Sequence, residues 1–153
     1  MSLKIILVSG PSGYGKTMWG TVASEYGEDP RVRPMAFAAP VKAEAIRRGL
    51  FVPGISKTQE VRDTLWLVSQ SMLPTPLEMS IQELKALPRY VEVAVFTDHR
   101  YAWESQAINQ LFDKVFFVRL TEKHRYGLST VEVAQAARRF TLDVLNGGSP
   151  TWD

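Results

Sequence analysis

The sequence of 153 residues contains no cysteine and only two histidines, His99 and His124. The missing cysteines exclude a disulfide scaffold, a thiolate zinc site and a cysteine nucleophile, and two histidines are too few for a histidine-rich metal site. A chain without cysteine fits a reducing compartment such as the cytoplasm. The sequence also lacks a run of lysine and arginine, a net charge far from zero (+2) and an apolar stretch long enough to span a bilayer. We therefore expect neither a nucleic-acid partner nor a membrane partner.

What the sequence does contain is an alternation of short apolar runs with segments of helical periodicity. The apolar runs, which predict buried strands, lie at 5–8, 35–38, 91–96 and 115–118. This alternation predicts an α/β fold, a three-layer sandwich in which a parallel sheet of four to five strands carries helices on both faces. We expect one domain over 1–148, with a helical insertion at 38–90, and a loose tail at 149–153.

Helix starts are indicated by three segments of the capping-box type, in which Ser or Thr precedes Glu or Gln by three residues. They are Ser56 to Gln59, Ser80 to Glu83 and Ser129 to Glu132. The helix after the first has an apolar stripe of Val61, Leu65, Val68 and Met72, and a later helix has one of Trp103, Ala107, Ile108 and Leu111.

A glycine-rich segment after the first apolar run matches G-x-x-x-x-G-K-[ST], the phosphate-binding motif of P-loop NTPases. Backbone N–H groups of such a loop wrap phosphates, and the glycines permit the backbone angles that this requires. Lys16 would bring a positive charge to the β- and γ-phosphates, and the Thr17 hydroxyl would be a ligand for Mg²⁺. The sequence thus predicts ATP and Mg²⁺ as cofactors, with ATP held by Gly10, Ser12, Gly13, Tyr14, Gly15, Lys16 and Thr17.

An acidic residue, Asp98, follows the buried run 91–96, as in a Walker-B element. It could orient Mg²⁺ together with Thr17, or act as the base that draws a proton from the acceptor. The competing interpretation is an aspartate that caps the next helix.

Two further stretches narrow the class of P-loop protein. Residues 36–42 (Ala-Phe-Ala-Ala-Pro-Val-Lys) and 97–104 (Thr-Asp-His-Arg-Tyr-Ala-Trp-Glu) are similar to the Phe-Ala-x-Pro-Leu-Lys and Thr-Asp-x-Arg-Phe-x-x-Glu segments of phage-type deoxynucleoside monophosphate kinases. With the motif at 10–17, the resemblance spans roughly residues 3–120. It implies a P-loop kinase fold and ATP-dependent phosphorylation of a deoxynucleoside monophosphate (dNMP), in the host cytoplasm if the protein is phage-encoded.

The same resemblance makes Arg100 a clamp for the acceptor phosphate and Glu104 its support. A charge argument agrees on Arg100, because two polyanions can meet only where fixed cations neutralise their repulsion. We therefore take Lys16, Asp98 and Arg100 as the catalytic candidates. The alternative is an exposed Arg100 that merely pairs with Glu104, four residues further on.

Further cations are weaker candidates. Lys42 and Arg62, with Arg47 and Arg48 beside them, fall in the insertion and could bind the acceptor or belong to a solvated helix face. The segment 120–130, which carries Arg125, is a candidate for a short lid. Arg138 and Arg139 could serve the lid or form the polar face of the last helix.

Two other functions remain open. One is a kinase for another small molecule, such as a sugar acid or a mevalonate phosphate, and the other is a nucleotide-binding regulatory protein without turnover. Aromatic residues that stack on a base would favour the dNMP, and Phe51 and Trp66 are candidates, although both could belong to the core. The oligomeric state is open, with a homodimer as one option.

Overall fold

The computed structural model describes residues 3–11, 16, 19–20, 22 and 30–152, without the side chain of residue 125. The chain divides into two compact units. One, which we call the helical unit, comprises Phe37–Ala86. The other, which we call the sheet unit, comprises Met1–Ala36 and Leu87–Asp153.

The sheet unit contains a sheet of four parallel strands within the described part of the chain, in the order β2-β3-β1-β4. This confirms the predicted α/β class with a parallel sheet. The strands are β1 (Lys4–Ser9), β2 (Val32–Met35), β3 (Val93–Phe96) and β4 (Lys114–Arg119). The prediction of a strand at 35–38 was displaced, because β2 begins at Val32 and includes Pro34. Proline is tolerated there since β2 is an edge strand.

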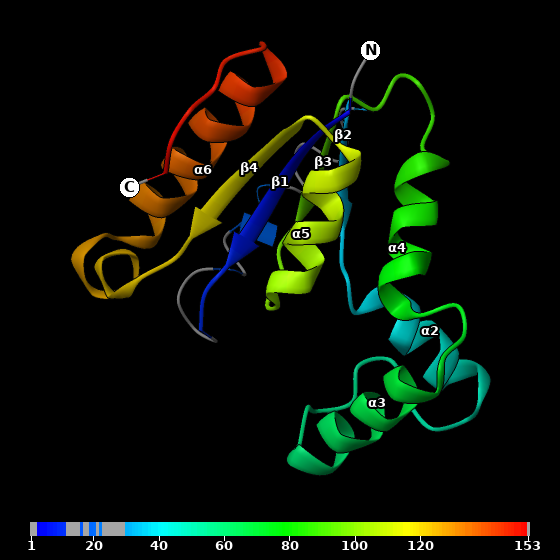
Figure 1. Ribbon diagram of the computed structural model, residues 1–153. Helices are drawn as coiled ribbons and strands as arrows, with labels where there is room; N and C mark the ends of the chain where they lie inside the picture. The colour runs from blue at the N-terminus through cyan, green and yellow to red at the C-terminus, as the bar shows by residue number, and fades with distance from the viewer. Residues whose placement is uncertain (1–2, 12–15, 17–18, 21, 23–29, 153) are drawn as a thin grey trace. The chain divides into compact units, whose positions relative to one another are not determined.

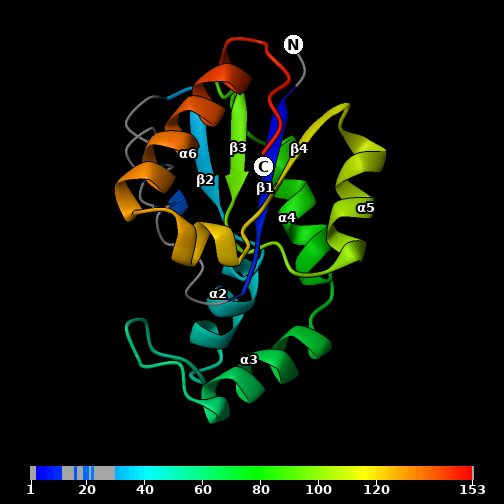
Figure 2. The same ribbon diagram turned by 90° about the vertical axis from the view of Figure 1, so that its left-hand side faces the viewer.

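Two helices cover opposite faces of this sheet, α5 (Ala102–Leu111) on one and α6 (Thr130–Leu145) on the other (Figures 1 and 2). The alternation of side chains along each strand explains the division. On the α6 side, Ile6, Val8, Val93, Val95 and Val118 form one cluster with Ala137, Phe140 and Val144 of α6. Of the stripe predicted for α5, only Ile108 is fully buried, whereas Trp103 and Leu111 are exposed.

The end of the chain packs against the sheet unit, unlike the loose tail that the sequence suggested. The Trp152 ring lies edge-on to Trp19 and Phe140, with centroids 5.3 and 6.0 Å away, and stacks on the His124 ring at 5.2 Å. Trp19, which follows the glycine-rich motif in the sequence, is itself fully buried in the same cluster. Trp152 therefore joins three segments that are distant in the sequence.

The helical unit consists of α2 (Ala39–Arg47), α3 (Gln59–Ser71) and α4 (Pro76–Lys85). Its core is formed by Ala45, Val68 and Met72, and Phe51, Leu65 and Met79 are among the partly buried residues packed against it. Leu65, Val68 and Met72 of the stripe predicted for α3 thus contribute to this core, and Phe51 packs against it. Trp66 does not, because 58% of its side chain is exposed.

Two of the three predicted capping boxes were misplaced. The α3 helix begins after Thr58, whose hydroxyl accepts from the Val61 N–H at 3.3 Å, rather than after Ser56. Thr75 and Glu78 cap α4 reciprocally, and Ser80 is a buried residue within that helix. The third prediction is confirmed: Ser129 caps α6 and Glu132 returns a bond to the Ser129 N–H at 3.0 Å.

No helix in the described part of the chain is both long and apolar enough to cross a bilayer.

Candidate functional site

The ends of three parallel strands meet at one edge of the sheet and carry the candidate site. Beyond the strands proper, the His99 N–H donates to the Val8 carbonyl at 3.2 Å, and the Leu120 N–H donates to the Ser9 carbonyl at 2.9 Å. These bonds bring the segments after β3 and β4 alongside the end of β1. The strand order reverses between β1 and β3, since the chain leaves them for opposite edges of the sheet. Ligands bind at such a switch point, outside the carboxyl ends of the strands.

Gly10 leaves β1 in a conformation that a larger residue would not adopt. Its φ is +149°, and a Cβ atom there would lie 3.0 Å from both the Cβ and the carbonyl oxygen of Leu120. Only glycine combines this φ with so close an approach. The motif at 10–17 therefore starts from a fixed point against the end of β4.

Lys16, Asp98 and Arg100 share one electrostatic environment. Partial burial lowers the pKa of Lys16, the positive charge of Arg100 lowers it further, and the negative charge of Asp98 raises it. Lys16 and Asp98 are half-buried, and Arg100 is exposed. Two cations that repel each other beside one carboxylate form a site that an anion would stabilise. Asp98 and Arg100, the other two residues that the sequence singled out for catalysis, thus both act electrostatically on Lys16.

Glu104 fixes the backbone that carries Arg100. One carboxylate oxygen, Oε1, accepts hydrogen bonds from the N–H groups of Arg100 and Tyr101, both at 2.9 Å. Glu104 is buried, and this burial raises the pKa of its carboxyl, while the two backbone donors act in the opposite direction. Glu104 therefore contacts Arg100 through the main chain. Asp98 is not the helix cap considered above, because Tyr101 is the residue that precedes α5.

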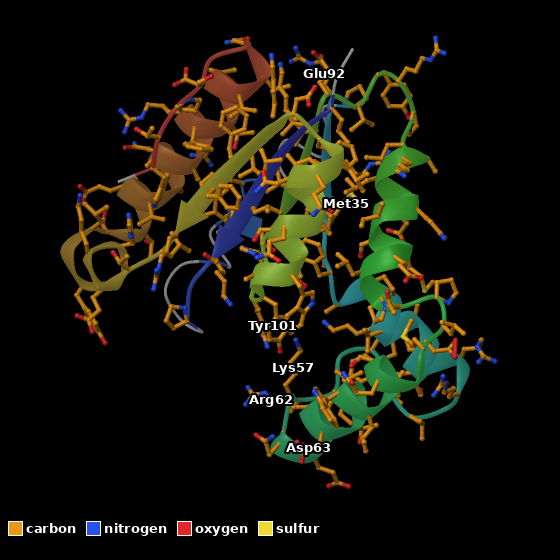
Figure 3. All side chains as sticks on the ribbon, in the orientation of Figure 1. Met35, Lys57, Arg62, Asp63, Glu92 and Tyr101 are labelled. Carbon is orange, nitrogen blue, oxygen red and sulfur yellow. The ribbon has the colours of Figure 1, made fainter. Side chains whose placement is uncertain are left out.

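Other predicted residues belong to the helical unit or fall outside the described residues. Ser12, Gly13, Tyr14, Gly15 and Thr17 of the ATP-binding set lie outside the described residues. Lys42 is half-buried on α2, and Arg62 is exposed near the start of α3, where Figure 3 shows its side chain beside that of Asp63. Both belong to the helical unit.

Arg47 and Arg48 form part of a helix surface. Both guanidinium groups bind the Glu44 carboxylate, with nitrogen–oxygen distances of 2.5–2.9 Å. Arg48 also donates to the Ser71 hydroxyl at 2.6 Å. These hydrogen bonds, that from Arg47 first, lower the pKa of Glu44 to about 2. The sequence allowed acceptor binding or a solvated helix face for these arginines, and their contacts are those of a helix face.

The segment predicted as a lid contains a π-helical turn, η1 (Lys123–Gly127), which includes the backbone of Arg125. His124 is buried in this turn, and its Nδ1 atom accepts from the Thr121 N–H at 3.0 Å. Arg138 and Arg139 are exposed on α6. The turn is therefore anchored at His124 against Trp152.

A pair of stacked rings that local sequence patterns do not predict lies directly after Arg100. Tyr101 and Trp103 stack with centroids 4.1 Å apart and an angle of 6° between their planes. Helical periodicity assigned Trp103 to the core, yet 57% of its side chain is exposed. The available signal was the cluster of two aromatic residues directly after the arginine.

No group of three or more His, Cys, Asp or Glu side chains suited to a metal ion occurs among the described residues. Mg²⁺ in phosphoryl-transfer sites needs only one or two carboxylates, because substrate phosphates and water complete its shell. Asp98 alone satisfies that requirement, and Thr17 would be the second protein ligand.

No family model matches the sequence, and no curated protein matches it significantly.

Proposed function

We propose that this protein is a P-loop kinase that transfers the γ-phosphoryl group of ATP to a dNMP. The observation that carries the proposal is the placement of the motif at 10–17 directly after β1, beside Asp98 and Arg100, which follow the neighbouring strand β3 and act electrostatically on Lys16 at the carboxyl edge of the sheet. The topology supports it, because this edge is the switch point at which α/β proteins bind ligands.

The charges at this edge suit two phosphate groups that must approach each other. Lys16, in the motif at 10–17, would contact the β- and γ-phosphates of ATP, and Arg100 would hold the acceptor phosphate. The two cations oppose one another, which contributes to the lowered pKa of Lys16. Bound phosphates would attract both cations and offset their mutual repulsion, so the positive charges of the site are preorganised for anions.

The transfer itself requires one bond to form and one to break. A phosphate oxygen of the acceptor bonds to the γ-phosphorus of ATP, the bond from that phosphorus to the β–γ bridging oxygen breaks, and ADP leaves. Lys16 and Arg100 would stabilise charge on the transferred group from two sides. Asp98 would hold Mg²⁺ with Thr17, or accept a proton if the acceptor oxygen carries one. Mg²⁺, when bound, supplies further positive charge to the phosphates.

The choice of a dNMP as acceptor depends on the resemblance of 36–42 and 97–104 to phage-type dNMP kinases. Both stretches carry a cation for a monophosphate, Lys42 in the first and Arg100 in the second. Glu104, also part of the second stretch, supports the backbone of Arg100. Lys42 and Arg62 remain acceptor-binding candidates.

The test is ADP release in the presence of Mg-ATP and a panel of acceptors that includes the common dNMPs, ribonucleoside monophosphates, gluconate and mevalonate phosphate. We expect release that depends on one or two dNMPs and is lost in Lys16→Ala. Dependence on an acceptor without a base would identify a different small-molecule kinase. ATP binding without release for any acceptor would identify a regulatory protein.

A further inference from the structure

The stacked pair Tyr101 and Trp103 is unusual for its place on the helix. Side chains two residues apart on a helix point in different directions and do not face each other. Tyr101 escapes this restriction because it precedes α5 with an extended backbone, at φ −118° and ψ 140°. Its ring can therefore turn to lie flat against that of Trp103. The two rings lie one on top of the other, and this stacked pair presents an aromatic surface to solvent, with 44% of Tyr101 and 57% of Trp103 exposed.

This surface is held to the candidate phosphate site by the main chain. Tyr101 directly follows Arg100, and one oxygen of Glu104 accepts from the N–H groups of both residues. Figure 3 shows Tyr101 at the beginning of α5, beyond the carboxyl ends of the strands in the same unit. A flat apolar surface and the cation that acts on Lys16 are thus fixed by one buried carboxylate.

We propose that Tyr101 and Trp103 form the platform on which the base of the acceptor nucleotide stacks. The inference rests on the proposed function and names the acceptor class from a feature of this chain. A nucleotide joins an aromatic ring to a phosphate, and the platform beside Arg100 offers one partner for each. Bases stack on exposed aromatic side chains through their faces, whichever base they carry. A sugar acid or a mevalonate phosphate has no ring to place there.

The platform belongs to the acceptor rather than to ATP because of the strand that delivers it. Lys16 and the motif at 10–17 follow β1, whereas Arg100 and the platform follow β3. The base should therefore accompany the phosphate that Arg100 holds.

Equilibrium binding tests the proposal without requiring turnover. Isothermal titration calorimetry would give dissociation constants for the common dNMPs, 2-deoxyribose 5-phosphate and Mg-ATP with the intact protein. We expect Trp103→Ala to weaken dNMP binding about tenfold or more. Trp103→Phe, which keeps a ring, should recover most of the affinity. Binding of 2-deoxyribose 5-phosphate and of Mg-ATP should change by less than about twofold, since neither uses the platform.

Tyr90→Ala is the matched comparison, because Tyr90 is an aromatic residue with a similar exposed fraction, 55%, but precedes β3 whereas the platform follows it. We expect this variant to bind dNMPs as the original protein does. Unchanged dNMP affinity in Trp103→Ala, a loss confined to Mg-ATP, or an equal loss in Tyr90→Ala would each overturn the platform.

The two proposals fail in different ways. If Trp103→Ala turns over a dNMP with the rate and affinity of the original protein, the kinase proposal is supported and the platform proposal is contradicted. If dNMP binding depends on Trp103 but no ADP is released, the platform proposal is supported and the kinase proposal is contradicted. No measurable binding of any dNMP would overturn the platform directly.

Discussion

Glu104 accepts the backbone N–H of Arg100 at 2.9 Å, across the first turn of α5, from a position that is 8% exposed. This hydrogen bond positions the backbone of Arg100 and leaves the charge of its guanidinium group unpaired with Glu104. The same oxygen holds Tyr101. A single acceptor atom therefore places the phosphate-binding candidate and the first ring of the platform.

Substitutions of Glu104 should separate its hydrogen bonds from its charge. Glu104→Gln keeps one oxygen that can accept both N–H groups, whereas Glu104→Ala leaves two backbone donors without their acceptor. We expect Glu104→Ala to lower the free energy of unfolding by about 2 kcal/mol and Glu104→Gln to leave it unchanged or higher at neutral pH. Urea unfolding measures both values. Equal losses in the two variants would mean that the charge matters more than the bonds.

The difference in the free energy of unfolding between the original protein and Glu104→Gln should depend on pH. Burial raises the pKa of Glu104 above its ordinary value of 4.5, so the folded state binds the proton more tightly than the unfolded state does. The original protein therefore gains stability relative to Glu104→Gln as the pH falls through the raised pKa toward 4.5. A stability difference that does not change with pH over this range would contradict the raised pKa.

Arg100→Ala should impair the use of the acceptor far more than the binding of ATP. Hydrogen bonds from a charged donor to phosphate make large contributions, so we expect kcat/KM for the acceptor to fall about a hundredfold. The dissociation constant of Mg-ATP should change by less than about threefold. Steady-state kinetics and ATP titration measure the two quantities.

Arg89→Ala is the control for that experiment. Arg89 is an exposed arginine that precedes β3, whereas Arg100 follows it. The loss of acceptor use in both variants would indicate a general effect of net charge. A loss of ATP affinity in Arg100→Ala, with acceptor use unchanged, would contradict the clamp.

How far the sequence predicts this site depends on the range of the interactions involved. The strands and the glycine-rich motif are recognisable from runs of a few residues, and the Ser129 cap from one pair of residues three apart. The starts of α3 and α4 were missed because Ser56 and Ser80 match the capping-box pattern as well as Thr75 does, whereas Thr58, three residues before Val61, does not match it. Burial decides among them, and it depends on tertiary packing.

The two unexpected aromatic features share a similar cause. Trp103 falls on the apolar side of a helical pattern, and only the extended backbone at Tyr101 turns it into half of an exposed stack. Trp152 stands in a short polar tail, and its partners Trp19, His124 and Phe140 come from distant segments. Local periodicity contains no information on either contact.

Lys16→Met should abolish phosphoryl transfer without destabilising the protein. Methionine keeps the length of the side chain but removes a charge that burial and Arg100 both disfavour. We expect ADP release to fall about a hundredfold or more, with a free energy of unfolding equal to or above that of the original protein at neutral pH. Lys85→Met, at an exposed lysine on α4, should change neither quantity.

The lowered pKa of Lys16 also predicts how that comparison depends on pH. The unfolded state binds the proton up to the ordinary lysine value of 10.5, while the folded state releases it at lower pH. The original protein therefore gains stability relative to Lys16→Met as the pH rises toward 10.5. Normal transfer in Lys16→Met at any pH would remove Lys16, and with it the P-loop assignment, from the proposal.

Trp152→Ala should destabilise the sheet unit and loosen the segment around η1. The ring contacts Trp19 and Phe140 in the core and stacks on His124, so its removal opens a gap beneath the turn that includes Arg125. We expect a loss of about 2 kcal/mol in the free energy of unfolding, below the value for a fully buried tryptophan because Trp152 is half-buried. Amide hydrogen exchange of residues 121–127 should accelerate more than that of β1, because the turn loses a direct contact. Thr151→Ala, at the exposed neighbouring residue, is the matched control and should affect neither measurement. If the end of the chain is only a tail, Trp152→Ala will unfold at the same urea concentration as Thr151→Ala, and the exchange rates of 121–127 will not differ between the two variants.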